Sequence, residues 1–392
     1  MARHGTGRWV GAMIGVALVG WAVSLLPADE ASAAGPGNGA RTDGGDGGAA
    51  VSGSGGGQQP AASGIKPRSQ SEVEKTIATD GPKPPDWLAA TALRFPATLD
   101  LTWARPARGQ RWDQNKYLGQ FIWSVVNPNP SQWKNGVKLM YKVMDVNKDD
   151  ETKLVQTYDA LARMYFNYFK DYARAAYWWQ KAGESSNIQL ARCYFELGNL
   201  DMAKKILLQY PFDTTREGDV INAWGTFGDM DRALRIAKDR ISSNAPDIGY
   251  LVAGDVCRVA GRYDDALKYY SEYMKLPKMY NWKNKQRAQD GYNTIKYFQM
   301  FNLAKVPDGT YSGSATGYRG AVTSKVTVKD HKIVDIKVSH REDQCYSAIT
   351  QVPGEILQKQ SVKDIDACAG ATMTSNAIIM GTAKAMGDAA KP

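Results

Sequence analysis

The chain has 392 residues, of which 49 are basic and 40 acidic, giving a formal net charge of +9. This length leaves room for two folded units beside a linker, and no dense run of Lys and Arg marks a nucleic-acid-binding patch. The 4 cysteines form neither a CxxC nor a CxxCH motif, which argues against iron–sulfur clusters and c-type haem.

Residues 1–33 have the pattern of a secretory signal peptide. Arg3 and Arg8 precede an apolar run from Trp9 to Leu26, and the small-residue sequence Ala31-Ser-Ala33 follows it. Since the apolar run is about 18 residues long, near the lower limit for a membrane-spanning helix, an uncleaved N-terminal anchor is the alternative. Either way we expect an exported protein, periplasmic or otherwise extracytoplasmic, for which nucleic acid is not a partner.

Residues 34–84 are rich in Gly, Ala and Ser and predict a disordered linker. Such a segment cannot bury enough apolar surface to offset the entropy that it would lose on ordering. Pro84 and Pro85 end it, and an α-helical domain is predicted over residues 85–303. Its first part, Trp112–Met144, carries two helical patterns separated by Asn127-Pro-Asn-Pro130.

Four turns with one shared pattern predict that this domain is built from helical repeats. Each turn begins with a helix-breaking residue. An apolar residue stands two positions after it, usually followed by Asp, and Ala stands five positions after it. The alanines recur after 28, 30 and 33 residues, close to the tetratricopeptide period of about 34. Such a solenoid offers a surface to a protein partner, whereas a generic domain of helical hairpins is the alternative. The turns are Lys170–Ala175, Gly198–Ala203, Gly228–Ala233 and Gly261–Ala266.

The last part of the chain changes from helical to strand periodicity. Thr310–Val338 alternates apolar and polar residues and is rich in Val, Ile and Thr, which predicts an antiparallel sheet. A helix over Cys345–Gln360, interrupted early by Pro353-Gly354, and a final helix over about Ser375–Met386 follow. The predicted architecture is therefore multidomain, with an all-α solenoid of tetratricopeptide-like repeats followed by a small α+β domain over residues 304–392.

The sequence Asp366-Ala-Cys-Ala-Gly-Ala-Thr-Met-Thr-Ser375 is the strongest functional signal in the chain. It places the hydroxyl of Thr372 on a tight Gly-Ala turn that opens into an apolar helical run. The start of a helix suits a phosphate, because backbone N–H groups are unpaired there and the helix dipole is positive. By itself the pattern also fits an ordinary helix cap formed by Thr374 and Ser375.

Four segments match one known domain along its length. Asp308–Gly313 fits the pattern D-G-x-Y-x-G, and Ala321–Val328 and Lys332–Val338 fit paired strands. Asp366–Thr372 fits D-x-x-[S/T]-G-A-[S/T] at every defined position except Ala369. This part of the chain resembles the FMN-binding domain of the periplasmic flavin subunits of sodium-pumping NADH:quinone reductase and Rnf complexes. In that family a flavin transferase, using FAD, joins FMN through a phosphoester to the last hydroxyl of the attachment motif.

The resemblance implies which residues carry the cofactor. Thr372 takes the position of the attachment residue and Asp366 that of the leading acid of the motif. Two departures are Ala369, where the family usually has Ser or Thr, and His331, at a turn where the family commonly has Gly. The candidate cofactor-binding residues are Thr372, Asp366, Gly370, Ala371, Thr374 and Ser375; no catalytic or metal-binding residue is predicted.

The cysteines divide into two pairs. Cys193 and Cys257 fall within helical patterns, so we expect them to be small buried residues. Cys345 and Cys368 both lie in the C-terminal domain of an exported protein, where a disulfide between them is one possibility and two unpaired buried thiols the other.

These features predict an exported electron-transfer flavoprotein rather than an enzyme with its own substrate. The chain has no GxGxxG motif for NADH and no residue pairing typical of catalysis, so a covalently held FMN is best interpreted as an electron relay. The helical repeats would dock it to a protein redox partner or membrane electron-transfer complex, and a flavin transferase would be needed for maturation. The alternatives are an envelope scaffold with a vestigial flavin domain and an extracytoplasmic flavin-dependent reductase.

Overall fold

The computed structural model describes most of the chain after the predicted signal and the first part of the linker. All described residues lie in one compact unit, residues 55–392. Among them, no helix is long and apolar enough to span a membrane. The predicted signal, 1–33, lies outside the described residues. The described ranges are 65–99, 112–184, 187–210, 217–243, 246–276, 282–300, 302–342, 347–363, 365, 367–368 and 371–390.

Helix α1 (Gln70–Asp80) corrects the predicted extent of the linker, because it lies inside residues 34–84. Ser69 caps it: its hydroxyl accepts a hydrogen bond from the backbone N–H of Glu72, whose side chain accepts one from the backbone N–H of Ser69. Val73 and Ile77 are fully buried, and the helix packs against α5 (Tyr172–Lys181). The Gly/Ser-rich composition of the preceding residues does not extend into this helix.

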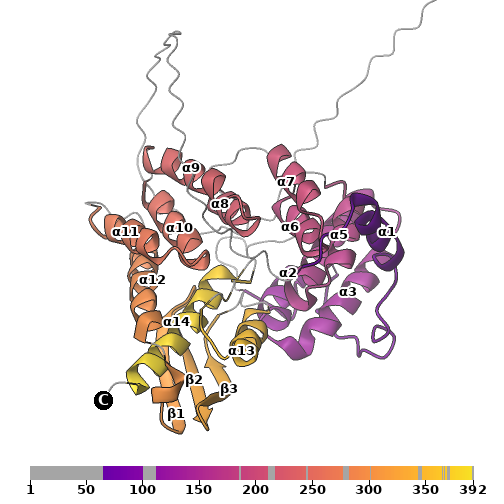
Figure 1. The fold of residues 1–392 in the computed structure, drawn as a ribbon. Helices are drawn as coiled ribbons and strands as arrows, with labels where there is room; N and C mark the ends of the chain where they lie inside the picture. The colour runs from indigo at the N-terminus through magenta and orange to yellow at the C-terminus, as the bar shows by residue number, and fades with distance from the viewer. Residues whose placement is uncertain are drawn as a thin grey trace, which may run out of the picture. The chain divides into compact units, whose positions relative to one another are not determined.

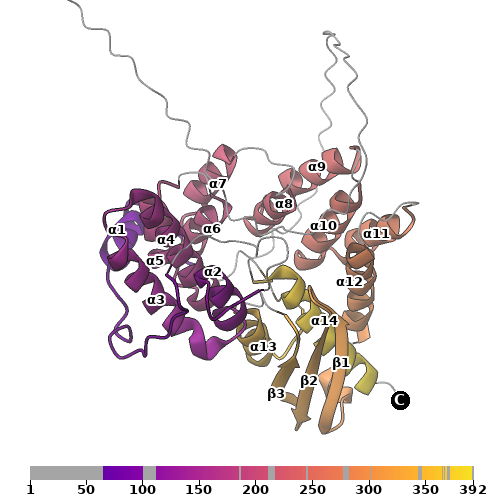
Figure 2. The same cartoon turned by 180° about the vertical axis from the view of Figure 1, so that it is seen from behind.

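Helices α2 to α12 confirm the helical region; the colours of Figure 1 follow it along the chain, and α4 is labelled in Figure 2. The two patterns predicted over Trp112–Met144 form α2, with the π-helical turn that continues it, and α3. Later helices pair as consecutive hairpins, α4 with α5, α6 with α7, α8 with α9 and α10 with α11. The tetratricopeptide class of these hairpins stays a prediction. The bounds are α2 Leu118–Phe121, α3 Trp133–Val146, α4 Glu151–Met164, α6 Ile188–Glu196, α7 Leu200–Gln209, α8 Glu217–Thr226, α9 Met230–Ile241, α10 Pro246–Val259, α11 Tyr263–Met274 and α12 Trp282–Met300.

The four repeated turns have a common backbone geometry. Their first residue has a positive φ, 50° at Lys170, 99° at Gly198, 79° at Gly228 and 71° at Gly261, as expected at the end of a helix. The alanine five positions on is fully buried in every case. The residue after the breaker caps the next helix in three of them, where a side-chain oxygen of Asp171, Asn199 or Asp229 accepts a backbone hydrogen bond.

The C-terminal sheet has three antiparallel strands in the order β1-β2-β3: β1 (Gly309–Thr316), β2 (Ala321–Lys329) and β3 (Lys332–Ser339). A two-residue turn joins β2 to β3, with φ of 51° at Asp330 and 57° at His331. Two positive φ values fit the right-handed twist of a tight hairpin. Asp308, the first residue of the D-G-x-Y-x-G pattern, accepts a hydrogen bond from the backbone N–H of Asp330 at 2.9 Å and so holds this turn.

One face of the sheet is covered by α14 (Thr372–Ala389), which packs on β1 and β2. The helix lies in front of the strands in Figure 1 and behind them in Figure 2. Alternate residues of β2 are buried beneath it, as the period-2 pattern predicts. Helix and strand meet through two glycines: a Cβ at Gly313 would lie 2.1 Å from the backbone oxygen of Gly381, so neither position has room for a side chain.

Two helices of this domain differ from their predicted bounds. Helix α13 (Ala348–Lys359) runs through Pro353 without interruption, and Pro353 is buried, as are Val352 and Ile356 of the same helix. Helix α14 begins at Thr372 rather than near Ser375. The hydroxyl of Ser375 donates to the backbone oxygen of Ala371 one turn earlier, so Ser375 lies inside the first turn instead of capping it.

Candidate functional site

Thr372 is the first residue of α14 and is half-buried. The preceding residue, Ala371, occupies the N-cap position, and no side chain among the described residues forms a capping hydrogen bond there. Helix starts normally use Ser, Thr, Asp or Asn at this position to satisfy the first backbone N–H groups. The α14 start therefore combines a hydroxyl with backbone donors that no N-cap side chain engages, which is the arrangement that binds phosphate.

The hydroxyl of Ser375 shapes the turn that leads to Thr372. Its oxygen accepts a hydrogen bond from the backbone N–H of Cys368 at 3.0 Å and donates to the backbone oxygen of Ala371 at 3.0 Å. The backbone N–H of Ala371 in turn donates to the oxygen of Cys368 at 3.0 Å. Ser375 is fully buried, so its side chain holds the turn instead of facing solvent.

Glu342 was not predicted from the sequence, yet its carboxylate joins three parts of the site. It is 3% exposed and accepts hydrogen bonds from the hydroxyl of Thr374 at 2.8 Å and from the backbone N–H groups of Tyr318 and Arg319 at 2.9 and 2.8 Å. A Cβ at Gly317 would lie 2.7 Å from the carboxylate, so the turn after β1 closes tightly on it. The carboxylate thus ties this turn to the first turn of α14. The only sequence signal for it is an acidic pair, Glu342 and Asp343, shortly after a predicted strand, a pattern that many exposed loops share.

The remaining predicted site residues lie outside the described residues. These are Asp366 and Gly370, together with the departure Ala369. Cys345, one half of the possible disulfide, also lies outside them, whereas Cys368 is a buried free thiol. Burial raises the pKa of the Cys368 thiol, so it is neutral at physiological pH. Cys193 in α6 and Cys257 in α10 are buried free thiols, as predicted.

Comparison with known proteins supports the C-terminal assignment. Residues 317–387 match the model of the FMN-binding domain family. This part of the chain is an FMN-binding domain. An uncharacterized protein of Treponema pallidum is 35% identical over 105 residues, a match that spans 26% of this chain and 29% of that protein. No solved structure matches the chain.

The residues around Thr372 fit a covalently held FMN. The start of α14 offers backbone donors for a phosphate, and Thr372, which carries the hydroxyl, is half-buried rather than buried. Ser375 and Glu342 hold the described backbone on either side of Thr372 with buried hydrogen bonds. Within the described part of the chain, no group of three or more His, Cys, Asp and Glu is arranged to hold a metal ion.

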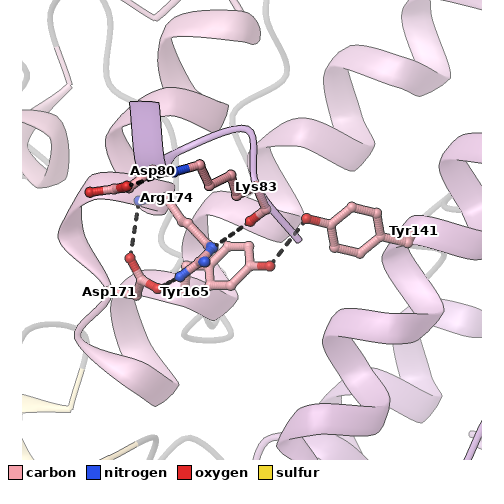
Figure 3. Close-up of polar contacts among 6 residues, drawn as sticks. All are labelled: Asp80, Lys83, Tyr141, Tyr165, Asp171 and Arg174. Carbon is pink, nitrogen blue, oxygen red and sulfur yellow. Dashed lines mark hydrogen bonds and ion pairs between the residues drawn. The ribbon is translucent and has the colours of Figure 1, made fainter. Parts of the chain in front are cut away.

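A second group of polar side chains lies in the helical region (Figure 3). Arg174 donates from Nε to the backbone oxygen of Lys83 at 2.8 Å and pairs with Asp171, and the hydroxyls of Tyr141 and Tyr165 are 3.2 Å apart. Burial raises the pKa of both tyrosines, so their hydroxyls are neutral at physiological pH. This cluster connects the segment after α1 to α5 and α3, and it is structural.

A cavity of about 440 Å³ lies beside this cluster. Its lining is mostly apolar, and Lys138, which borders it, uses its ammonium group to donate to the backbone oxygens of Ala89 and Thr91 at 2.9 and 2.5 Å. None of its lining residues belongs to the FMN-binding domain. The lining residues are Pro84, Pro85, Asp86, Leu88, Ala89, Leu93, Lys138, Tyr141, Lys142 and Asp145.

Proposed function

We propose that this protein is an exported electron-transfer flavoprotein that carries FMN joined through a phosphoester to Thr372. The observation that carries the proposal is the placement of Thr372: the only hydroxyl of the attachment motif is the first residue of α14, at a helix start without a side-chain cap. The match of residues 317–387 to the FMN-binding domain supports the identity of the cofactor. Maturation would require a flavin transferase that uses FAD.

The protein would hold the phosphate and orient the flavin, while bound FMN would supply one- and two-electron transfer. Backbone N–H groups at the start of α14 would hold the phosphate, and the helix dipole would add partial positive charge there. Ser375 and Glu342 fix the backbone on both sides of Thr372, which keeps the point of attachment in one position. A covalent link also prevents loss of the flavin in a compartment without a flavin pool.

The helical hairpins would dock the protein to a redox partner or to a membrane electron-transfer complex. Docking raises the local concentration of two redox centres and so speeds exchange between them. The competing proposal is an envelope scaffold in which the hairpins carry the function. Ala369 favours that alternative, since it replaces a hydroxyl of the attachment motif.

Replacement of the chromosomal copy by Thr372→Ala tests the relay against the scaffold. The relay requires the flavin, so we expect Thr372→Ala to abolish the cellular function and Thr372→Ser, which keeps a hydroxyl for attachment, to retain it. Protein abundance would be measured by immunoblot to exclude instability as the cause. Full function with Thr372→Ala, at normal abundance, would mean that the flavin is dispensable and that the scaffold is the better account.

A further inference from the structure

The FMN-binding domain contacts the helical region at the elements that flank Thr372. The guanidinium of Arg258, near the end of α10, donates from Nη2 to Oδ1 of Asn376 at 2.8 Å. Asp290, in α12, accepts a hydrogen bond from the backbone N–H of Thr316 at 3.1 Å, just where β1 ends. The helical region therefore binds both the first turns of α14 and the strand end that precedes the Glu342-bound turn.

Asn376 is four residues after Thr372, so the two share one face of α14 and are about 6 Å apart along the helix axis. Arg258 thus brings a permanent positive charge to the face of the helix that carries the attachment hydroxyl. The Arg258 side chain is buried, with 5% of the residue exposed, and lies beside Asp255. The carboxylate of Asp255 accepts hydrogen bonds from the Tyr270 hydroxyl at 2.7 Å and from Arg287 at 3.3 Å.

The interface here is packed and is not a ligand pocket. The space left between the two parts is about 10 Å³, enough for roughly one water molecule. Farther along α14, a Cβ at Gly387 would lie 2.5 Å from the ring of Tyr297 in α12, so the helices remain in close contact over several turns. The residues that border the space are Asp255, Arg258, Arg287, Asp290, Gly291, Thr316, Met373, Asn376 and Met380.

We propose that the helical region is a part of the flavin site, and that Arg258 is a positioning residue that fixes the first turns of α14 through Asn376. This inference rests on the proposed attachment of FMN to Thr372 for its functional meaning. The hydrogen bond between Arg258 and Asn376 is present in the protein without the cofactor. The helical region accordingly has a role inside the molecule, in addition to any partner that it docks.

Hydrogen exchange of the full-length protein without flavin tests the contact directly. In Arg258→Gln we expect amides of residues 371–377 to exchange about tenfold faster, the size expected for loss of one charge-assisted hydrogen bond, with β2 and β3 unchanged. Arg262→Gln is the matched control, because Arg262 also carries one positive charge but pairs with Asp265 at 2.6 Å on the exposed side of the helical region. It should leave these amides at the wild-type rate.

Asn376→Ala removes the other half of the contact and keeps the test valid if Arg258→Gln does not fold. It should give the same increase, and the double variant should add nothing to it. Wild-type exchange rates at residues 371–377 in folded Arg258→Gln or in Asn376→Ala would overturn the inference. A separate mass measurement gives the fraction of each variant that gains FMN on exposure to the transferase. An unmodified wild type would count against the attachment of FMN to Thr372 and not against the contact between Arg258 and Asn376.

Discussion

At the residue scale, three hydroxyls within four positions have three different roles. Thr372 is half-buried at the start of α14, Thr374 donates to Glu342, and Ser375 bridges Cys368 and Ala371. The attachment motif indicates the first of these from sequence alone. It cannot assign the other two, because a Thr/Ser-rich helix start has the same sequence whether its hydroxyls cap the helix, bind a ligand or bond to residues far along the chain.

Glu342 gives a prediction at the residue scale, because its buried carboxylate accepts hydrogen bonds from three protein donors. In Glu342→Gln one oxygen becomes an NH2 group that cannot accept from a backbone N–H, so a partly buried donor loses its partner. We expect the free energy of unfolding to fall by about 1–3 kcal/mol. Urea denaturation measures this, with Glu272→Gln as the control, since Glu272 pairs with Lys275 at the surface. Equal stability of both variants would show that the carboxylate does not tie the turn to α14.

At the scale of elements, periodicity predicts most of the fold. The alternation in β2, the four repeated turns and the cysteines of α6 and α10 all appear in the structure as expected. The differences come from tertiary contacts. The pairing of β3 with β2 shifts between Thr327 and Val328 of β2, which makes a bulge at Val334 in β3. Because of this bulge, Val334 is exposed while Ile333 and Ile336 are both buried. Likewise α1 lies inside the predicted linker, although its own residues carry a capping box and two apolar positions that are buried where the helix docks on α5.

The contact between β1 and α14 gives a prediction at this scale. Gly313→Ala should destabilise the protein by about 1–3 kcal/mol or more, because the added methyl group meets the rigid backbone of α14. Gly354→Ala is the matched control: Gly354 is exposed in α13 with nothing near a Cβ, so alanine should stabilise its helix by up to about 1 kcal/mol. Thermal unfolding of the two variants should therefore shift in opposite directions. A Gly313→Ala protein as stable as wild type would contradict the close packing of strand and helix.

At the scale of the whole molecule, the described helical region and the FMN-binding domain are connected by polar contacts between residues far apart in sequence. Arg258 and Asn376 are 118 positions apart. On the side of α13, Lys170 lies 3.5 Å from Glu355, and the backbone N–H of Ser347 donates to the oxygen of Asn167 at 3.1 Å. A single sequence gives no signal for such pairs, which is why it predicts two domains with separate roles. The contacts instead indicate that the described helical region and the FMN-binding domain form one connected structure, on which the proposed partner docking and flavin positioning would both depend.

The attachment of FMN to Thr372 is the central claim, and intact-mass measurement tests it most directly. The full-length protein would be produced in an exporting host together with the flavin transferase, alongside Thr372→Ser and Thr372→Ala. We expect wild type and Thr372→Ser to gain the mass of one FMN less one water, and Thr372→Ala to gain nothing. Fragmentation of the peptide 364–384 should locate the added mass on residue 372. An unmodified wild-type protein under these conditions, or FMN retained in Thr372→Ala, would contradict the account.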